Sequence, residues 1–196
     1  VMLSDYRGAL ALWEAHPELQ AASPPHVGRR VASAMANLGD TESAFAFASK
    51  LLERPDLDGL TRMALVEVCG ITRFYESDYI GAEIFFRRTI EISREISLTN
   101  RADAAFYNRG LSLQQLGRYR EAVADIEESA RIATESSDAM SYASARGLLG
   151  EQLFEIGDYN RAEELMLESL GVFEQGRQSE NSVDCQGNLS DLYHDW

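Results

Sequence analysis

A short phrase occurs three times in this 196-residue sequence at intervals of forty residues, beginning at positions 77, 117 and 157. Ser77–Ala82, Gly117–Ala122 and Gly157–Ala162 each place a small residue first, a tyrosine third and an alanine sixth. Weaker copies begin at Ser4 and Gly39. A fixed period of this kind is typical of repeat architectures, in which each unit buries its apolar faces against its neighbours. The phrase therefore constrains the fold before any single residue is considered, and it directs the search for function toward a surface.

Apolar residues follow each phrase in steps of four, as at Ala122, Ile126 and Ala130. This spacing keeps them on one face of a helix. A second apolar pattern precedes each phrase, so each unit predicts a helix A, a short turn and a helix B. We expect Asp40 and Asp158 to cap the helices that follow them. Helices A are predicted over 25–38, 57–76, 101–116, 141–156 and 181–195, and helices B over 4–16, 41–53, 79–96, 119–135 and 159–174.

Glycine recurs inside helix A at Gly70, Gly110 and Gly150. A glycine within a helix costs about 0.5–1 kcal/mol relative to alanine. Its recurrence at one register position predicts a compensating gain, which we take to be a close approach of the backbone of helix B. The tyrosines at 79, 119 and 159 are expected to pack against the preceding helix A.

Together, the small residue in helix A, the turn with its tyrosine, the alanines at 82, 122 and 162 and the bulky residue four positions later resemble the tetratricopeptide repeat family. The resemblance covers essentially the whole chain and points to the branch with repeats of about forty residues, found in bacterial regulators and kinesin light chains. It implies an all-α fold: a right-handed superhelical solenoid of antiparallel helix pairs.

The register predicts one repeat array over residues 1–196, cut from a longer protein. Its parts are a half repeat at 1–22, repeats at 23–60, 61–100, 101–140 and 141–180, and a half repeat at 181–196. Both ends would then expose apolar surface, so a homodimer through the repeat ends is a further hypothesis.

Composition limits the classes of partner and the cellular setting that we expect. With 32 acidic residues against 18 Lys and Arg, the net charge is −14, which disfavours direct nucleic-acid binding. We expect no membrane span and no signal peptide. Cys69 and Cys185 are interpreted as reduced thiols in the core of a cytoplasmic protein.

Catalytic constellations are not found in the sequence. His16, His26 and His194 fall in different repeats without metal-ligand spacing, and no glycine-rich phosphate loop occurs. We therefore predict that the chain is not an enzyme and requires no metal and no cofactor.

The family resemblance implies that helices A line a concave groove. Register assigns the following candidates to it: Arg29, Arg30, Phe74, Tyr107, Asn108, Gln114, Glu151, Phe154 and Asn188. Phe74 and Phe154 share one register position with Gln114 between them, and aromatic rings beside amides suit an extended peptide. The alternative, that these rings only pack between helices, stays open.

Asn108 and Asn188 also share a register, one at which peptide-binding members hold the ligand backbone. The lysines of the family's carboxylate clamp are missing, because Lys50 is the only lysine and lies in a helix B. Arg29 and Arg30 would have to replace their charge.

We interpret the chain as a non-enzymatic module that binds a protein or peptide partner in this groove. One alternative is a domain that senses a small effector or a signalling peptide within a multidomain bacterial transcriptional or signalling regulator. Another is a self-assembly surface.

Overall fold

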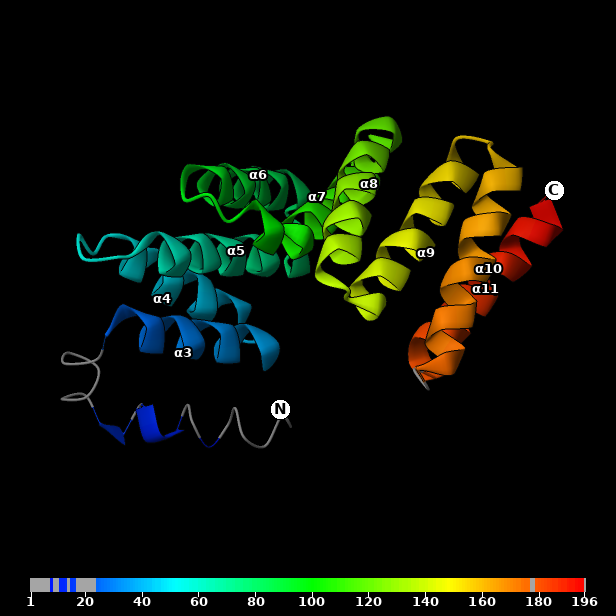
Figure 1. The fold of residues 1–196 in the computed structure, drawn as a ribbon. Helices are drawn as coiled ribbons and strands as arrows, with labels where there is room; N and C mark the ends of the chain where they lie inside the picture. The colour runs from blue at the N-terminus through cyan, green and yellow to red at the C-terminus, as the bar shows by residue number, and fades with distance from the viewer. Residues whose placement is uncertain (1–7, 9–10, 14, 17–23, 177–178, 196) are drawn as a thin grey trace. The chain divides into compact units, whose positions relative to one another are not determined.

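The computed structural model describes the chain except residues 1–7, 9–10, 14, 17–23, 177–178 and 196 (Figure 1). Every regular element in the described ranges is a helix, which confirms the all-α class of stacked helix pairs. Contacts between Cα atoms divide the chain into two compact units, residues 1–97 and 98–196.

From residue 24 onward, unit 1 contains two consecutive helix pairs. Its helices are α3 (Pro25–Asn37), α4 (Thr41–Leu52), α5 (Gly59–Tyr75) and α6 (Tyr79–Glu95). Each packs against the next, and α3 also contacts α5. The helix predicted over 4–16 lies mostly outside the described residues; of this stretch, 8, 11–13 and 15 are helical.

Unit 2 begins with a short 3-10 helix, η1 (Thr99–Arg101). The helices that follow are α7 (Asp103–Gln115), α8 (Tyr119–Ser136), α9 (Ala139–Glu155), α10 (Tyr159–Gln175) and α11 (Ser179–Asp195). Each helix packs against the next in sequence, and α9 also contacts both α7 and α11. The helices A of successive repeats, α7, α9 and α11, therefore lie beside one another.

Every helix predicted from residue 25 onward is present, with both ends within two residues of the prediction. Two of the differences arise from helix caps. Asp58 accepts a hydrogen bond from the Thr61 amide at 2.8 Å, so α5 begins at 59 and not at 57. Asp138 accepts from the Ser141 amide at 3.0 Å, so α9 begins at 139 and not at 141.

The backbone conformation of the turns explains the first residue of the repeated phrase. Ser77, Gly117 and Gly157 all adopt the left-handed region, with φ of 62°, 69° and 85°. Glycine adopts this conformation without steric cost, which accounts for a small residue at this position.

The residue after each of these positions is the N-cap of the next helix, as Asp40 is after Gly39. Asp40 and Asp78 cap α4 and α6 by accepting hydrogen bonds from the Ser43 and Gly81 amides. Asp158 is the N-cap residue of α10, as predicted, but its carboxylate makes no capping hydrogen bond and lies 3.5 Å from the guanidinium of Arg161.

The glycines of helix A lie where the bulky residue of helix B presses against the helix. A Cβ on Gly150 would lie 2.8 Å from Cγ of Met166 and 3.1 Å from the backbone oxygen of Ala162, and a Cβ on Gly70 would lie 2.7 Å from the Phe86 ring. A close approach is therefore present, but the nearest atoms belong to a helix B side chain, which at Gly110 is that of Ile126. Of the three glycines, Gly150 alone also has the predicted close backbone atom, because the Ala122 oxygen lies 3.6 Å from a Cβ on Gly110.

We expect Gly150→Ala to lower the free energy of unfolding, because the added Cβ meets the side chain of Met166 and a backbone oxygen that cannot move freely. Gly171→Ala in α10 is the matched control, since nothing lies within 4 Å of its added Cβ. It should raise stability by about 0.5–1 kcal/mol through helix propensity alone. Urea unfolding of both variants tests the prediction, and stabilisation by both would contradict the close-packing account.

One buried polar side chain departs from the repeat. In the register shared by Thr72, Ser112 and Gln152, the two hydroxyls donate to backbone oxygens of their own helices at 2.8 Å. Gln152 is fully buried, and neither atom of its amide has a hydrogen-bond partner among the described residues. Leaving such groups unpaired costs about 1–3 kcal/mol.

Gln152→Met should therefore stabilise the protein by about 1–3 kcal/mol, because methionine keeps a similar shape without the amide. Gln115→Met, at an exposed position of α7, is the control and should change stability little. Thermal unfolding followed by circular dichroism measures both. A lower melting temperature for Gln152→Met alone would mean that the amide is satisfied in solution.

Candidate functional site

Three of the predicted groove residues of unit 2, Tyr107, Gln114 and Asn188, lie around the carboxylate of a fourth, Glu151 on α9. Asn188, from α11, donates its side-chain amide to Glu151 Oε1 at 2.5 Å. Gln114, from α7, also hydrogen-bonds to this carboxylate, and Tyr107 lies within reach of its charge. Glu151 thus joins three successive helices A.

Burial determines how these groups ionise. It raises the pKa of Glu151 above its ordinary value of 4.5. The hydrogen bonds from Gln114 and Asn188 oppose this shift, whereas the like charges of Asp184 and Glu155 add to it. Burial, followed by the charge of Glu151, raises the pKa of Tyr107 to about 12.

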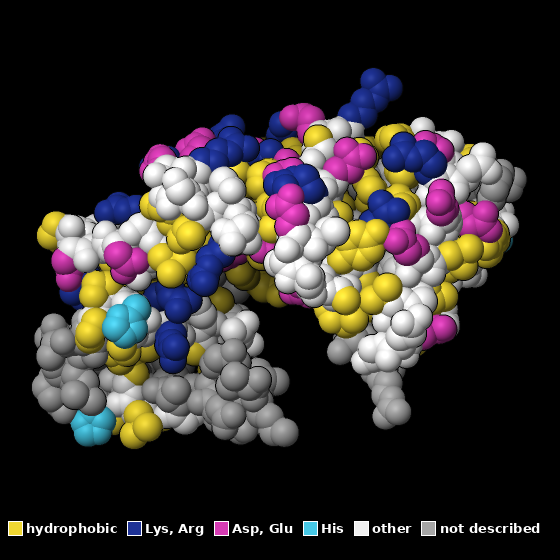
Figure 2. Space-filling model, in the orientation of Figure 1, with side chains coloured by type: hydrophobic (Ala, Val, Ile, Leu, Met, Phe, Trp, Pro, Cys, Tyr) yellow, Lys and Arg dark blue, Asp and Glu magenta, His cyan; other side chains and the backbone are white. Residues whose placement is uncertain are grey.

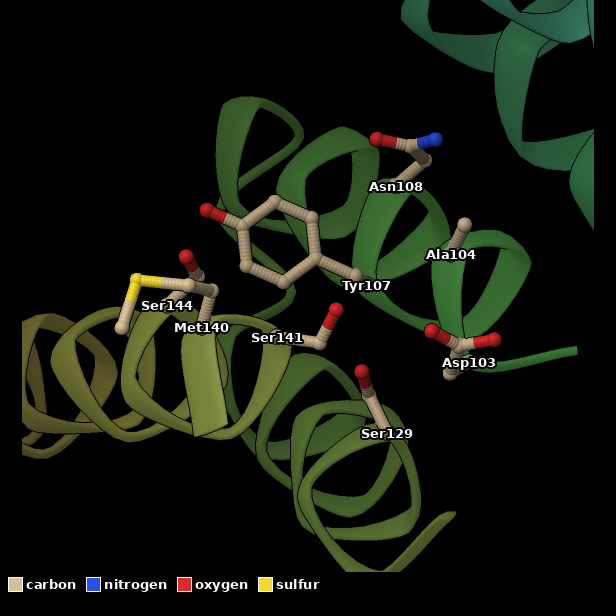
Figure 3. Close-up of a pocket in the computed structure, with 8 residues that line it drawn as sticks. All are labelled: Asp103, Ala104, Tyr107, Asn108, Ser129, Met140, Ser141 and Ser144. Atoms are coloured by element: carbon tan, nitrogen blue, oxygen red, sulfur yellow. The ribbon is translucent and has the colours of Figure 1, made fainter. Parts of the chain in front are cut away.

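Two cavities adjoin this cluster and share Tyr107 and Ser144 in their walls. The larger, of about 270 Å³, lies between α7, α8 and α9 and includes Asn108. In Figure 3 the Tyr107 ring lies across its centre, with Ser141 and Ser144 of α9 on one side and Asp103 of α7 on the other. The smaller, of about 130 Å³, includes Glu151, Asp184 and Asn188.

The arginines of α7 and α9 are engaged away from these cavities. Arg109 forms a bidentate ion pair with Asp125 of α8, at 2.5 and 2.6 Å. Arg146 donates to Glu168 of α10 at 2.7 Å, and the Tyr142 hydroxyl donates to the same carboxylate. Burial would raise the pKa of Glu168, but these hydrogen bonds and the charge of Arg146 outweigh it and lower that pKa.

The structure thus brings together five of the nine predicted residues: Tyr107, Asn108, Gln114, Glu151 and Asn188. Phe154, on the same unit, is half-buried and its ring packs 5.7 Å from that of Tyr159. In unit 1, Phe74 packs in the same way on Tyr79 at 5.4 Å. Arg29 is half-buried and Arg30 is exposed on α3. Whether any of these residues contacts a partner stays a prediction.

Sequence reasoning did not single out several cavity residues. Asp103, Ser129, Ser141, Ser144, Asn181 and Asp184 all line one of the two cavities. A usable signal existed, because Ser144 and Asp184 occupy the same repeat register and Asp184 lies one helical turn before Asn188. Cys185, interpreted as a core thiol, is buried and free, and it also lines the smaller cavity.

The face of unit 2 that Figure 2 draws is mixed in character. Figure 2 shows acidic side chains next to exposed apolar ones over α8 to α11. In the described part of the chain, no three or more His, Cys, Asp and Glu residues are grouped so as to hold a metal ion. None of the described helices combines the length and the apolar character needed to cross a bilayer.

Comparison with known proteins identifies the repeats. Residues 101–175, which contain α7 to α10, match the tetratricopeptide repeat family. No curated protein matches the chain. Among solved structures, the chain is similar to BtubC from P. vanneervenii, with 14% identity and a TM-score of 0.72 over 99% of this chain and 92% of that one.

Two further structures share the fold. The apo form of RapI has 14% identity and a TM-score of 0.81, over 98% of this chain and 73% of that one. A signal transduction ATPase with numerous domains from Pyrococcus horikoshii, which has a tetratricopeptide repeat sensor, has 17% identity and a TM-score of 0.75. That match covers 89% of this chain but only 29% of the ATPase. The fold is generally a non-catalytic scaffold for interactions.

The raised pKa of Glu151 predicts a pH dependence of stability. Between 4.5 and the higher pKa of the folded state, the folded chain binds more protons than the unfolded chain. The contribution of Glu151 therefore stabilises the fold at low pH and is lost as pH rises through this window. Glu151→Gln should unfold at a higher urea concentration than wild type at pH 7, and the difference should shrink toward pH 4. A difference independent of pH would show that the carboxylate is well solvated.

Proposed function

Because the chain is a tetratricopeptide repeat protein over residues 101–175, we propose that it is a non-enzymatic interaction module whose partner is a protein or peptide. The partner binds the face of unit 2 formed by α7, α9 and α11. The observation that carries this proposal is the meeting of five register-predicted polar residues beside two adjoining cavities.

The chemistry of this face suits an extended peptide. An extended backbone needs both hydrogen-bond donors and acceptors from its receptor. Asn108 and Asn188 offer both from amides in the cavity walls, and the half-buried ring of Tyr107 supplies an apolar contact between the two cavities. A few such anchors carry most of the affinity in protein interfaces. The two buried free thiols accord with a cytoplasmic location.

An effector-sensing role within a larger regulator is the second candidate. It is favoured by the likeness to the ATPase whose repeats form a sensor. A small effector that binds only the folded chain would raise the melting temperature without any macromolecular partner. The two roles are therefore separable by screening metabolites and peptides in the same thermal-shift assay.

Selection of binders from a peptide library displayed on phage tests the proposal. We expect selected peptides to bind wild type and to lose about tenfold or more in affinity with Asn108→Ala, because one buried amide contact is removed. Asn160→Ala, an exposed amide of α10 that lines neither cavity, is the matched control and should bind as wild type. If the affinity of the selected peptides falls equally with both substitutions, or with neither, the peptide does not bind at Asn108.

A further inference from the structure

The smaller cavity of unit 2 has an unusual charge balance. It lies between α7, α9, α10 and α11, and its walls include the carboxylates of Glu151 and Asp184. No Lys, Arg or His lines it among the described residues. The arginines nearest in sequence, Arg109 and Arg146, form ion pairs with Asp125 and Glu168 on helices B.

The groups that face Glu151 are neutral or negative. Gln114 and Asn188 stabilise its carboxylate with amide hydrogen bonds, whereas Asp184 and Glu155 repel it. Burial, and after it the charge of Glu151, raises the pKa of both Tyr107 and Cys185. The described part of α11 offers no Lys or Arg. Among the described residues, the hydrogen-bond donors that stabilise the carboxylate of Glu151 are therefore neutral amides.

Comparison between repeats shows that this carboxylate is not required by the packing. The residues at the register of Glu151 in the two preceding repeats are Ile71 and Leu111, and both are half-buried. An apolar residue at 151 would avoid the desolvation of a charge. Likewise, Asp184 stands where the earlier repeats have Ala104 and Ser144. Two successive helices A thus depart from the repeat pattern by introducing carboxylates that line one cavity.

The size and walls of the cavity also suit a particular kind of group. Its volume is about 130 Å³, several times the roughly 30 Å³ that one water molecule occupies in the liquid. That space admits an ammonium or guanidinium group with part of its aliphatic stem. Tyr107 and Phe173 line the cavity. The face of an aromatic ring attracts a cation, and the ring also offers apolar contact to the aliphatic stem that carries the charge. The side-chain oxygens of Asn181 and Asn188 add neutral acceptors.

We propose that this cavity receives a cationic side chain, arginine or lysine, of the bound peptide. The inference rests on the proposed peptide-binding function and names the ligand class for that same face. It also opposes the carboxylate clamp of the family, because an acidic tail would meet Glu151 and Asp184 with the same sign of charge. The net charge of −14 also attracts a cationic peptide to the chain at long range.

The probe is the tripeptide N-acetyl-glycyl-arginyl-glycinamide, titrated into the isotope-labelled chain and followed by NMR. Its partner probe replaces arginine by citrulline, which keeps the shape and removes the charge. We expect the arginyl peptide to shift amide resonances at Ser144, Asp184 and Cys185 and to bind about tenfold or more tightly than the citrullyl peptide. Equal binding of the two probes, or no shifts at these residues, would overturn the inference.

Two variants localise the effect. Glu151→Gln and Asp184→Asn should each reduce the preference for arginine over citrulline. Asp184 is exposed, so its substitution is the less disruptive of the two to the fold. Glu164→Gln makes the same charge change at an exposed position of α10 outside the cavity and should keep that preference.

The same variants separate this inference from the proposed function. Phage-selected peptides that depend on Asn108 but tolerate arginine-to-citrulline exchange would leave the interaction module intact and overturn the cationic assignment. Arginine-selective tripeptide binding without any peptide that depends on Asn108 would support the cavity and contradict the wider binding face.

Discussion

The contact between a helix A glycine and a bulky helix B side chain sets the geometry on which the rest of the structure depends. Met166 lies where a side chain on Gly150 would be, and Phe86 does the same at Gly70. This contact fixes the rotation of each helix A against its helix B. Once Gly150 faces α10, the residues at 144, 147 and 151, spaced by three and four, form one stripe on a neighbouring side of α9. The candidate site is therefore a consequence of the packing register.

At some register positions, one repeat has charged side chains where another has apolar ones. The pair Arg109–Asp125 stands where the next repeat has Leu149 and Leu165. The bidentate geometry and the burial of Asp125 make this a strong but costly replacement for an apolar contact. By holding Arg109 on the helix B side, it also leaves the carboxylate of Glu151 without a cation from α7. The structural ion pairs and the charge of the cavity are thus two results of one arrangement.

The fold follows from the sequence to within two residues at each helix end from residue 25 onward, because one period governs both the apolar face and the turn. Two of the remaining differences depend on single side chains that periodicity does not report, the Asp58 and Asp138 caps. For the site, register placed Tyr107, Asn108, Gln114, Glu151 and Asn188 on one face. It also predicted that the turn tyrosines pack against the preceding helix A, as Tyr79 and Tyr159 do, but not that their partners there are the rings of Phe74 and Phe154. The register of Asp184 was a usable signal for its place on this face, but its effect on the charge of Glu151 depends on a distance between helices that periodicity does not report.

A carboxylate at position 151 is difficult to explain by stability alone. The equivalent positions in the preceding repeats show that the architecture accepts isoleucine or leucine there. Glu151 instead brings a charge into a buried setting beside other negative charges, and the amides that stabilise it return only part of that cost. A repeat protein tolerates an unfavourable residue at one position, because each unit packs mainly against its neighbours and the cost stays local. An unfavourable residue retained beside a cavity is consistent with a benefit that appears only when a ligand of opposite charge is bound.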